Sequence, residues 1–279
     1  MTSKALFDRV SIETSRLTTN AYSTSFSIGI RCLGKELRNP IYSIYGFVRF
    51  ADEIVDSFHD YHKEELLFRF RNDTMTAIEE KISLNPILNS FQATVHQFGI
   101  DLDLVDTFLK SMEMDLTQKS YDQQGFEEYV LGSAEVVGLM CLRVFCSDRQ
   151  MFDHLRPYAM KLGSAFQKIN FLRDLNADYN GLGRIYFPGL DVDRFDENSK
   201  KRIEESIRED FEVAYEGIRQ LPRSSKLGVY VAYVYYLALF KKIRNTPPGF
   251  VMKQRISIRN RQKLSILCSS YIKHQLNLI

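Results

Sequence analysis

The distribution of apolar residues along the chain predicts helices, and one of these helices carries a narrow polar stripe. Between residues 162 and 178, apolar residues recur every three or four positions, as on one face of a helix. They are Leu162, Ala165, Ile169, Leu172 and Leu175. At about 100° per residue, the polar residues gather in a sector of roughly 80°. This stripe of two carboxylates and two amides consists of Gln167, Asn170, Asp174 and Asp178.

The same helix is predicted to end shortly after its polar stripe. Residues 180–183 (NGLG) contain two glycines, which are typical of a helix C-terminus followed by a tight turn. Pro188 then prevents an immediate restart of the helix.

A second helix of the same design is predicted over residues 41–58. Asn39-Pro40 should end the preceding element, because a residue before proline avoids the helical region and proline suits a first helical turn. The helix should therefore begin near Ile41. Its polar residues fall within roughly 60° of one another, away from the apolar face. They are Tyr45, Arg49, Asp52 and Asp56.

Each stripe places two aspartates four residues apart, where like charges repel and destabilise an isolated helix. A single acidic stripe is most often a solvated face, and Asp56 and Asp60 form a further pair of this spacing by overlap alone. Two such helices favour a shared cation. Mg²⁺ prefers oxygen ligands and commonly binds through one or two carboxylates plus substrate phosphates, so two facing acidic helices would suit it.

Three segments together resemble the signature segments of the squalene/phytoene synthase family. They are Tyr22–Phe26 (YSTSF), Ile41–Asp56 (IYSIYGFVRFADEIVD) and Gln167–Pro188 (QKINFLRDLNADYNGLGRIYFP). The resemblance runs from about Tyr22 to about Lys263. It implies an all-α, isoprenoid synthase-type helical bundle around a central cavity, with residues 1–279 as a single domain. It also implies a magnesium-dependent enzyme, with Mn²⁺ as a substitute ion, that joins two isoprenoid diphosphates head to head.

The resemblance assigns roles to residues of both stripes and of the flanking segments. The expected catalytic aspartates are Asp52, Asp56, Asp174 and Asp178. The expected metal ligands are Asp52, Glu53, Asp56, Asn170, Asp174 and Asp178. The expected substrate-binding residues are Ser25, Phe26, Tyr45, Arg49, Gln167, Arg173, Tyr236 and Arg255. The chain departs from the family at Thr24, where a basic residue often stands, and this removes one expected phosphate contact.

Composition and charge exclude several other classes. The formal net charge is only +2, which disfavours a nucleic-acid-binding protein. No histidine follows a glutamate by three residues, so the ligands of a di-iron bundle are missing. The cysteines form no Cys-x-x-Cys pair, and we expect them to be reduced and buried in a cytoplasmic protein. They are Cys32, Cys141, Cys146 and Cys268.

The remaining segments predict scaffold helices and no membrane span. Residues 227–240 are too short to cross about 30 Å of hydrocarbon and contain four tyrosines, so we expect a buried helix. The charged residues 191–222 predict an outer, solvent-facing helix. Gly132, Ser133, Ala134 and Gly138 would let another helix or a hydrocarbon chain approach closely. The N-terminal residues predict an amphipathic helix and no secretory signal.

From the resemblance we expect two geranylgeranyl diphosphates to be joined to phytoene, through a cyclopropyl diphosphate and without NADPH. The alternatives are squalene or dehydrosqualene synthesis from farnesyl diphosphate, head-to-tail prenyl elongation, and a catalytically silent scaffold protein. An apolar product would favour peripheral association with the inner face of the membrane. The oligomeric state is left open.

Overall fold

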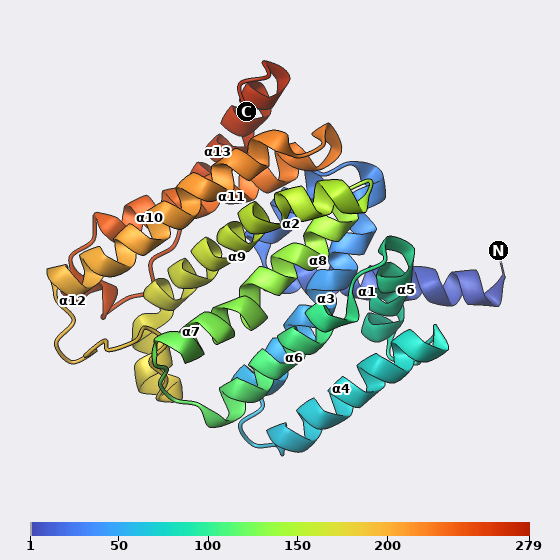
Figure 1. Cartoon of the computed structure of the whole chain (residues 1–279), viewed down its shortest axis with the longest axis horizontal. Helices are drawn as coiled ribbons and strands as arrows, with labels where there is room; N and C mark the ends of the chain where they lie inside the picture. Colours follow the sequence, from blue (N-terminus) through green and yellow to red (C-terminus); the bar gives the residue numbers. More distant parts are fainter. Residues whose placement is uncertain (1) are drawn as a thin grey trace.

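Helices form the regular elements of residues 2–279, the part of the chain that the computed structural model describes (Figure 1). The single β feature in this part is an isolated parallel bridge between Ser120 and Ile185. The predicted all-α class is therefore confirmed. The long helices are α1 (Ser3–Tyr22), α3 (Lys35–Ser57), α4 (Lys63–Glu80), α5 (Pro86–Phe98), α6 (Leu102–Thr117), α9 (Arg149–Ala177), α10 (Glu197–Gln220), α11 (Arg223–Arg244) and α13 (Asn260–Gln275). The shorter ones are α2 (Thr24–Arg31), α7 (Gln123–Val130), α8 (Val136–Phe145), α12 (Pro248–Val251) and the π-helical segments η1 (Leu131–Glu135) and η2 (Asp178–Leu182).

The predicted helix start near Ile41 is wrong, because α3 begins at Lys35 and continues through Pro40. A proline at this position removes one backbone hydrogen bond and disfavours the helix. Leu37 and Ile41, one turn apart, are both buried on the same face of α3. Packing of this face keeps the turn before Pro40 helical.

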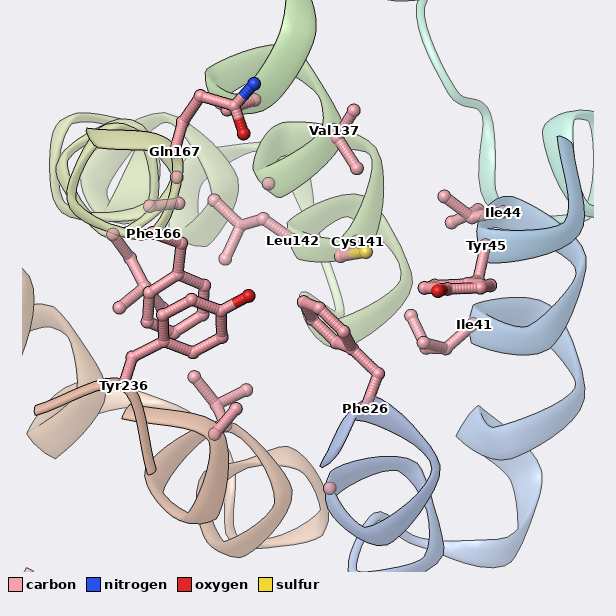
Figure 2. A pocket seen from close by; sticks show the side chains of 18 of the residues that line it. Phe26, Ile41, Ile44, Tyr45, Val137, Cys141, Leu142, Phe166, Gln167 and Tyr236 are labelled. Carbon is pink, nitrogen blue, oxygen red and sulfur yellow. The ribbon is translucent and has the colours of Figure 1, made fainter. Parts of the chain in front are cut away.

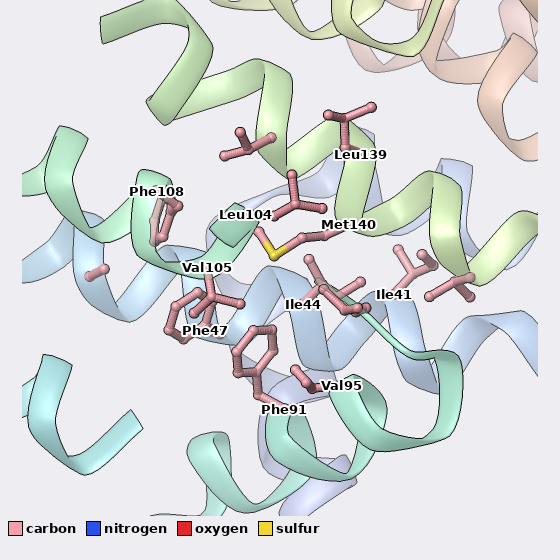
Figure 3. Packing of buried hydrophobic residues seen from close by; sticks show 14 of the residues in the cluster. Ile41, Ile44, Phe47, Phe91, Val95, Leu104, Val105, Phe108, Leu139 and Met140 are labelled. Atoms are coloured by element: carbon pink, nitrogen blue, oxygen red, sulfur yellow. The ribbon is translucent and has the colours of Figure 1, made fainter. Parts of the chain in front are cut away.

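One hydrophobic core fixes the back of α3 against α5, α6 and α8 (Figure 3). At its centre the rings of Phe47 and Phe91 stack, with centroids 3.9 Å apart and planes 6° apart. Phe108 from α6 packs against Phe47 at 5.3 Å. Complete burial of each such ring contributes about 1.5–3 kcal/mol. This core holds the opposite, polar face of α3 in a fixed orientation.

A second core packs α9 against α10 and α11 (Figure 1). The apolar face that was predicted for residues 162–175 supplies Ile169 and Leu172, both fully buried. The predicted buried helix over residues 227–240 lies in α11, where Leu239 and Phe240 are buried, so that prediction is confirmed. Across residues 2–279, no helix is both long and apolar enough to cross a membrane.

Close helix crossings explain the small residues of η1 and α8. A Cβ added to Gly132 would lie 2.5 Å from the Cβ of Ser111 in α6, so this crossing requires glycine. Gly163 of α9 approaches the carbonyl oxygen of Ala134 equally closely, since an added Cβ would lie 2.7 Å from it. The expected helix packing is therefore confirmed. Ser133, Ala134 and Gly138 also line a cavity, and the approach of a hydrocarbon chain to them stays a prediction.

The chain turns away from α9 where the glycines predicted it. The helix ends at Ala177, continues as the π-helical segment η2, and is closed by Gly183 with a φ of +67°. Only glycine adopts this left-handed conformation without strain. Asp178 therefore lies at the junction between α9 and η2, near the point where the following loop returns to Ser120.

The expectation of four buried cysteines is partly wrong. Cys32, Cys141 and Cys146 are half-buried, and Cys268 is exposed on α13. All four are free thiols in the structure. Cys268 is exposed because α13 packs on the bundle through other residues, Ile266, Ser270 and His274.

Candidate active site

A largely apolar cavity of about 470 Å³ lies between α2, α3, α8, α9 and α11 (Figure 2). Phe26 projects into it from α2, between Tyr45 of α3 and Tyr236 of α11. The centroid of the Phe26 ring lies 5.7 Å from that of the Tyr45 ring and 6.2 Å from that of the Tyr236 ring. Phe166 stacks on Tyr236 with centroids 3.9 Å apart. Aromatic faces from four helices thus surround the middle of the cavity.

The cavity has one polar end and one apolar end. At the polar end, Arg49 and Asp52 come from α3, Asn170 and Arg173 from α9, and Arg255 from the segment after α12. The apolar end is lined by Leu33, Phe145, Leu155, Tyr158 and Leu221. The two stripes that the sequence predicted therefore face one shared cavity, and they meet at its polar end.

A chain of hydrogen bonds joins the amides of the α9 stripe to the opposite wall. Gln167 donates from Nε2 to the Oγ of Ser133 at 3.1 Å, and Asn170 donates from Nδ2 to the Oε1 of Gln167 at 3.4 Å. The hydroxyl of Tyr236 donates to the Oδ1 of Asn170 at 3.4 Å. These hydrogen bonds fix the side-chain amides of α9 relative to η1 and α11.

Burial and mutual repulsion keep two of the aspartates difficult to ionise. Burial, together with the neighbouring charge of Asp56, raises the pKa of Asp52 to about 8. Burial also raises the pKa of Asp178 to about 7, with contributions from Asp174 and Asp56. Because Asp56 lies on α3 and Asp178 on η2, their coupling places the ends of the two acidic stripes close together. The site has an excess of negative charge.

Arginines already neutralise the other two aspartates. Asp174 accepts hydrogen bonds from the Nε of Arg173 at 3.0 Å and from the Nε of Arg255 at 2.8 Å. Burial opposes the ionisation of Asp174, but these bonds outweigh it and lower the pKa of its carboxyl. Asp56 accepts a hydrogen bond from Arg184 at 2.9 Å.

A buried network that the sequence analysis missed supports this Arg184. Its guanidinium is only 7% exposed and donates to the main-chain oxygen of Asp115 at 2.8 Å. The carboxylate of Asp115 lies 3.4 Å from Arg184 and accepts the hydroxyl proton of Tyr129 at 2.6 Å. Tyr186 adds a longer contact to Asp115 at 3.4 Å. Arg184 therefore bridges the acidic stripe of α3 to a buried carboxylate of α6.

The donor set at the polar end fits a divalent cation. Within residues 2–279, no three acidic, histidine or cysteine side chains already surround one point as a ready metal site. The carboxylates of Asp52 and Asp178 nevertheless have raised pKa values, because they are buried and also have other acids nearby, and a cation would relieve the repulsion between these acids. The buried Nε of Arg49 has no hydrogen-bond partner, so a donor for an anion remains free beside them. Carboxylates and amide oxygens are the ligands that Mg²⁺ prefers.

The structure brings most of the expected residues to the polar end or to the walls of the cavity. The expected residues that line it are Phe26, Tyr45, Arg49, Asp52, Gln167, Asn170, Arg173, Tyr236 and Arg255. Asp56, Asp174 and Asp178 do not line it. Asp174 contacts the lining residues Arg173 and Arg255, and Asp56 lies one helical turn beyond Asp52. Glu53 forms an ion pair with Arg49, and the bonds from Ser57 and Arg49 outweigh burial and lower the pKa of Glu53. Ser25 does not line the cavity, whereas its neighbour Ser23 does.

A positively charged side chain also lies beside Thr24, the position where the resemblance led us to expect a basic residue. The Nζ of Lys263, at the start of α13, donates to the Oγ1 of Thr24 at 2.7 Å. The same ammonium lies 5.5 Å from the centre of the Tyr235 ring. A lysine 239 residues away in sequence thus places positive charge beside Thr24. The basic segment 251–263 gave the only sequence signal for it.

Fold and site together define an all-α protein with an aromatic cavity and an acidic, arginine-rich mouth. A family model, squalene/phytoene synthase, matches residues 19–262. The chain belongs to the squalene/phytoene synthase family.

Relatives of this chain are named for different products. The chain is 27% identical to a 4,4'-diapophytoene synthase of Staphylococcus haemolyticus over 66% of this chain and 64% of that protein. It is 33% identical to a presqualene diphosphate synthase of Sinorhizobium fredii, over 62% of this chain and 61% of that protein. A phytoene synthase of Cereibacter sphaeroides is 26% identical over 87% of this chain and 74% of that protein. The matches to the first two thus span less than two thirds of those relatives.

Solved structures bear out the fold. A dehydrosqualene synthase crystal structure superposes with a TM-score of 0.82 at 20% identity, covering 95% of this chain and 98% of that one. A squalene synthase from Alicyclobacillus acidocaldarius superposes with a TM-score of 0.75, also at 20% identity, covering 85% and 94% of the two chains. The predicted isoprenoid synthase-type bundle is therefore confirmed.

Proposed function

We propose that this chain is a prenyltransferase that joins two geranylgeranyl diphosphates head to head, through a cyclopropyl diphosphate, to give phytoene. The observation that carries the proposal is the length of the cavity. Leu155 and Arg173 both line it and lie eighteen residues apart in α9, which corresponds to about 27 Å along the helix.

This length suits a substrate of four isoprene units. With carbon–carbon bonds of about 1.5 Å, the extended geranylgeranyl chain spans roughly 19 Å, and the farnesyl chain roughly 14 Å. A geranylgeranyl chain with its diphosphate at Arg173 would reach the apolar end near Leu155. A farnesyl chain would leave that end unfilled, which forfeits packing contacts.

The arginines at the polar end would bind the diphosphate and stabilise the charge that develops on it. Arg49 offers its unpartnered Nε, and Arg173 and Arg255 offer guanidinium groups that suit paired phosphate oxygens. We expect Mg²⁺, with Mn²⁺ as a substitute, to be held by Asp52, Glu53, Asp56, Asn170, Asp174 and Asp178. The ion would supply charge neutralisation for the leaving group.

The rest of the cavity would protect and orient the carbocations. Rings of Phe26, Tyr45, Phe166 and Tyr236 present aromatic faces to the reacting carbons and exclude water. The hydrogen-bonded Gln167 and Asn170 keep the boundary between the polar end and the apolar walls in a fixed geometry. Loss of a proton from the last cation would give phytoene without a nicotinamide cofactor.

Product analysis tests this proposal. Purified protein is incubated with geranylgeranyl or farnesyl diphosphate, with Mg²⁺ or EDTA and with or without NADPH, and the extracted hydrocarbon is identified by mass spectrometry. We expect a forty-carbon product that requires Mg²⁺ and not NADPH. Asp52→Asn and Asp174→Asn should each nearly abolish it, whereas Asp60→Asn, outside both stripes, should not.

Two other functions would be distinguished by the same assay. The similarity to a diapophytoene synthase favours farnesyl diphosphate as the second candidate substrate, and a thirty-carbon product would establish it. A folded protein without product from either substrate would instead favour a silent scaffold protein. The intact aspartates of both stripes argue against that function, since a silent protein has no need of buried, repelling carboxylates.

A further inference from the structure

The outer face of α13 is unusually apolar. Leu264, Tyr271 and Ile272 are 61%, 52% and 57% exposed, and they fall within a sector of about 100° on the helix. The face that packs on the bundle instead contains the buried polar residues Ser270 and His274. Large apolar side chains that point outward while polar ones point inward indicate a binding surface. We call Leu264, Cys268, Tyr271 and Ile272 the α13 outer face.

The apolar face continues beyond α13, and the segment that carries it contains charged residues of one sign only. Leu276 and Leu278, just beyond α13, are 63% and 64% exposed. Residues 251–279 contain six lysines and arginines and no aspartate or glutamate. Among residues 2–279, no hydrogen-bond or ion-pair partner contacts the side chains of Lys253, Arg259 or Arg261. These cations remain available to an anionic partner.

The α13 outer face adjoins the polar end of the cavity. α13 packs along α11, and its C-terminal end projects beyond the bundle (Figure 1). Lys263, one residue before Leu264, contacts Thr24 next to the cavity residue Ser23. Arg255, in the same basic segment, contacts Asp174 at the cavity mouth. A partner bound at the N-terminal end of this face, around Leu264, would therefore lie beside the entrance, and the face runs from there along α11.

We propose that the α13 outer face and its surrounding cations dock the protein on an anionic lipid bilayer. Apolar side chains at the centre of a basic surface match the boundary between acyl chains and anionic headgroups. A second copy of the chain fits less well, because a two-fold contact through this face would bring two sets of six cations together. The proposal rests on the proposed function in one respect, since prenyl diphosphates and a hydrocarbon product partition into the bilayer.

The absence of tryptophan allows a direct test. Tyr271→Trp places a single fluorophore on the α13 outer face, and Phe68→Trp places one on α4, where Phe68 is 65% exposed. Vesicles of phosphatidylcholine, alone or with an equal amount of phosphatidylglycerol, are added. We expect a blue shift and quenching by brominated acyl chains at position 271 only, with the anionic vesicles only. An unshifted spectrum at 271, or equal shifts at both positions, would overturn the proposal.

Vesicle cosedimentation separates this surface from the active site. Leu264→Asp combined with Ile272→Asp should weaken binding to anionic vesicles at least about tenfold, because charged groups resist entry into the interface. Leu84→Asp, at a position 91% exposed beyond α4, should not weaken it. Turnover of detergent-dispersed substrate should be unchanged in both variants, so failure of the catalytic proposal is recognised separately. Wild-type binding to vesicles with no loss in the double variant, or a dimer that the double variant dissociates, would contradict the proposal.

Discussion

Arg184 shows how a single side chain can connect the catalytic surface to the protein interior. It is almost fully buried, yet it contacts Asp56 at the rim of the site and Asp115 in the interior. Burial opposes the charge of Arg184, but the nearby charge of Asp115 and the hydrogen bond that Arg184 donates to the hydroxyl oxygen of Tyr186 outweigh it and raise the pKa of Arg184. A permanent charge at this position compensates two acids whose sequence positions are far apart. The arginine is therefore needed for stability as well as for the arrangement of the acidic stripe.

We expect Arg184→Gln to destabilise the protein by about 3 kcal/mol, because removal of one partner leaves a buried carboxylate without compensation. Urea unfolding followed by circular dichroism measures the change. The double variant Arg184→Gln with Asp115→Asn should recover a substantial part of the loss, since it removes the stranded charge. Equal destabilisation in the single and double variants would show that Asp115 is not the group that Arg184 compensates.

At the scale of elements, periodicity predicted the helices of the site better than their limits. Both polar stripes lie on helices, α3 and α9, and both face the cavity. The start of α3 was missed because burial of Leu37 and Ile41 is a property of the packed bundle, which local proline chemistry does not contain. The glycine-rich end of α9 was predicted because positive φ is a local requirement.

Long-range contacts explain what the sequence could not reveal about the site. Lys263 reaches Thr24, and Arg184 reaches Asp56 and Asp115, only because distant helices are packed together. No spacing rule connects such residues. Tyr129 likewise carries no local pattern, and its role becomes visible only through its hydrogen bond to Asp115.

The π-helical segment η1 contains a carboxylate outside the proposed reaction site. Glu135 lines a second groove, between η1, α9 and α10, together with Lys161 and Lys168. Burial raises the pKa of Glu135 to about 7. The charge of Asp210 also raises this pKa, and the two lysines lower it only in part. The folded protein therefore binds this proton more tightly than the unfolded chain does.

The sign of the resulting pH dependence follows from linkage. The stabilising contribution of protonated Glu135 is complete below its ordinary pKa of 4.5 and is lost as the pH rises through about 7. Across this pH interval we expect the free energy of unfolding of the wild type to fall by on the order of 1 kcal/mol relative to that of Glu135→Gln, after allowance for solvent screening. Chemical denaturation of both proteins below pH 4.5 and above pH 7 measures the difference. A constant difference between them would contradict the assignment.

At the scale of the whole molecule, the two cores hold opposite walls of one long cavity. The α3 wall is anchored by the core around Phe47, and the α9 wall by the core around Ile169 and Leu172. If the proposed function holds, we expect substrate length to depend on the residues between these walls rather than on any one helix. Cys141 of α8 points into the cavity, opposite Ile41 and Tyr45 (Figure 2).

We expect Cys141→Phe to shift the preference toward the shorter substrate, because the larger ring shortens the apolar part of the cavity. Competition between equal amounts of farnesyl and geranylgeranyl diphosphate gives the product ratio directly. Overpacking should also lower stability by about 1–3 kcal/mol, so the assay is performed well below the unfolding temperature. Cys141→Ser, which leaves the space open, should retain the wild-type ratio.

The charge distribution at the cavity mouth predicts how the whole molecule responds to its proposed ligands. Asp52 and Asp178 have neighbouring acids, and the Nε of Arg49 has no hydrogen-bond partner, so cation and diphosphate should each improve the binding of the other. We expect Mg²⁺ with inorganic diphosphate to raise Tm by several degrees, because saturation at about 100 times Kd adds about 2.7 kcal/mol. Either ligand alone should have a smaller effect, and EDTA should abolish the combined shift. Differential scanning fluorimetry measures these shifts, and Asp174→Asn should reduce the combined one. An equal response to diphosphate with and without Mg²⁺ would show that the arginines bind the anion independently of the aspartates.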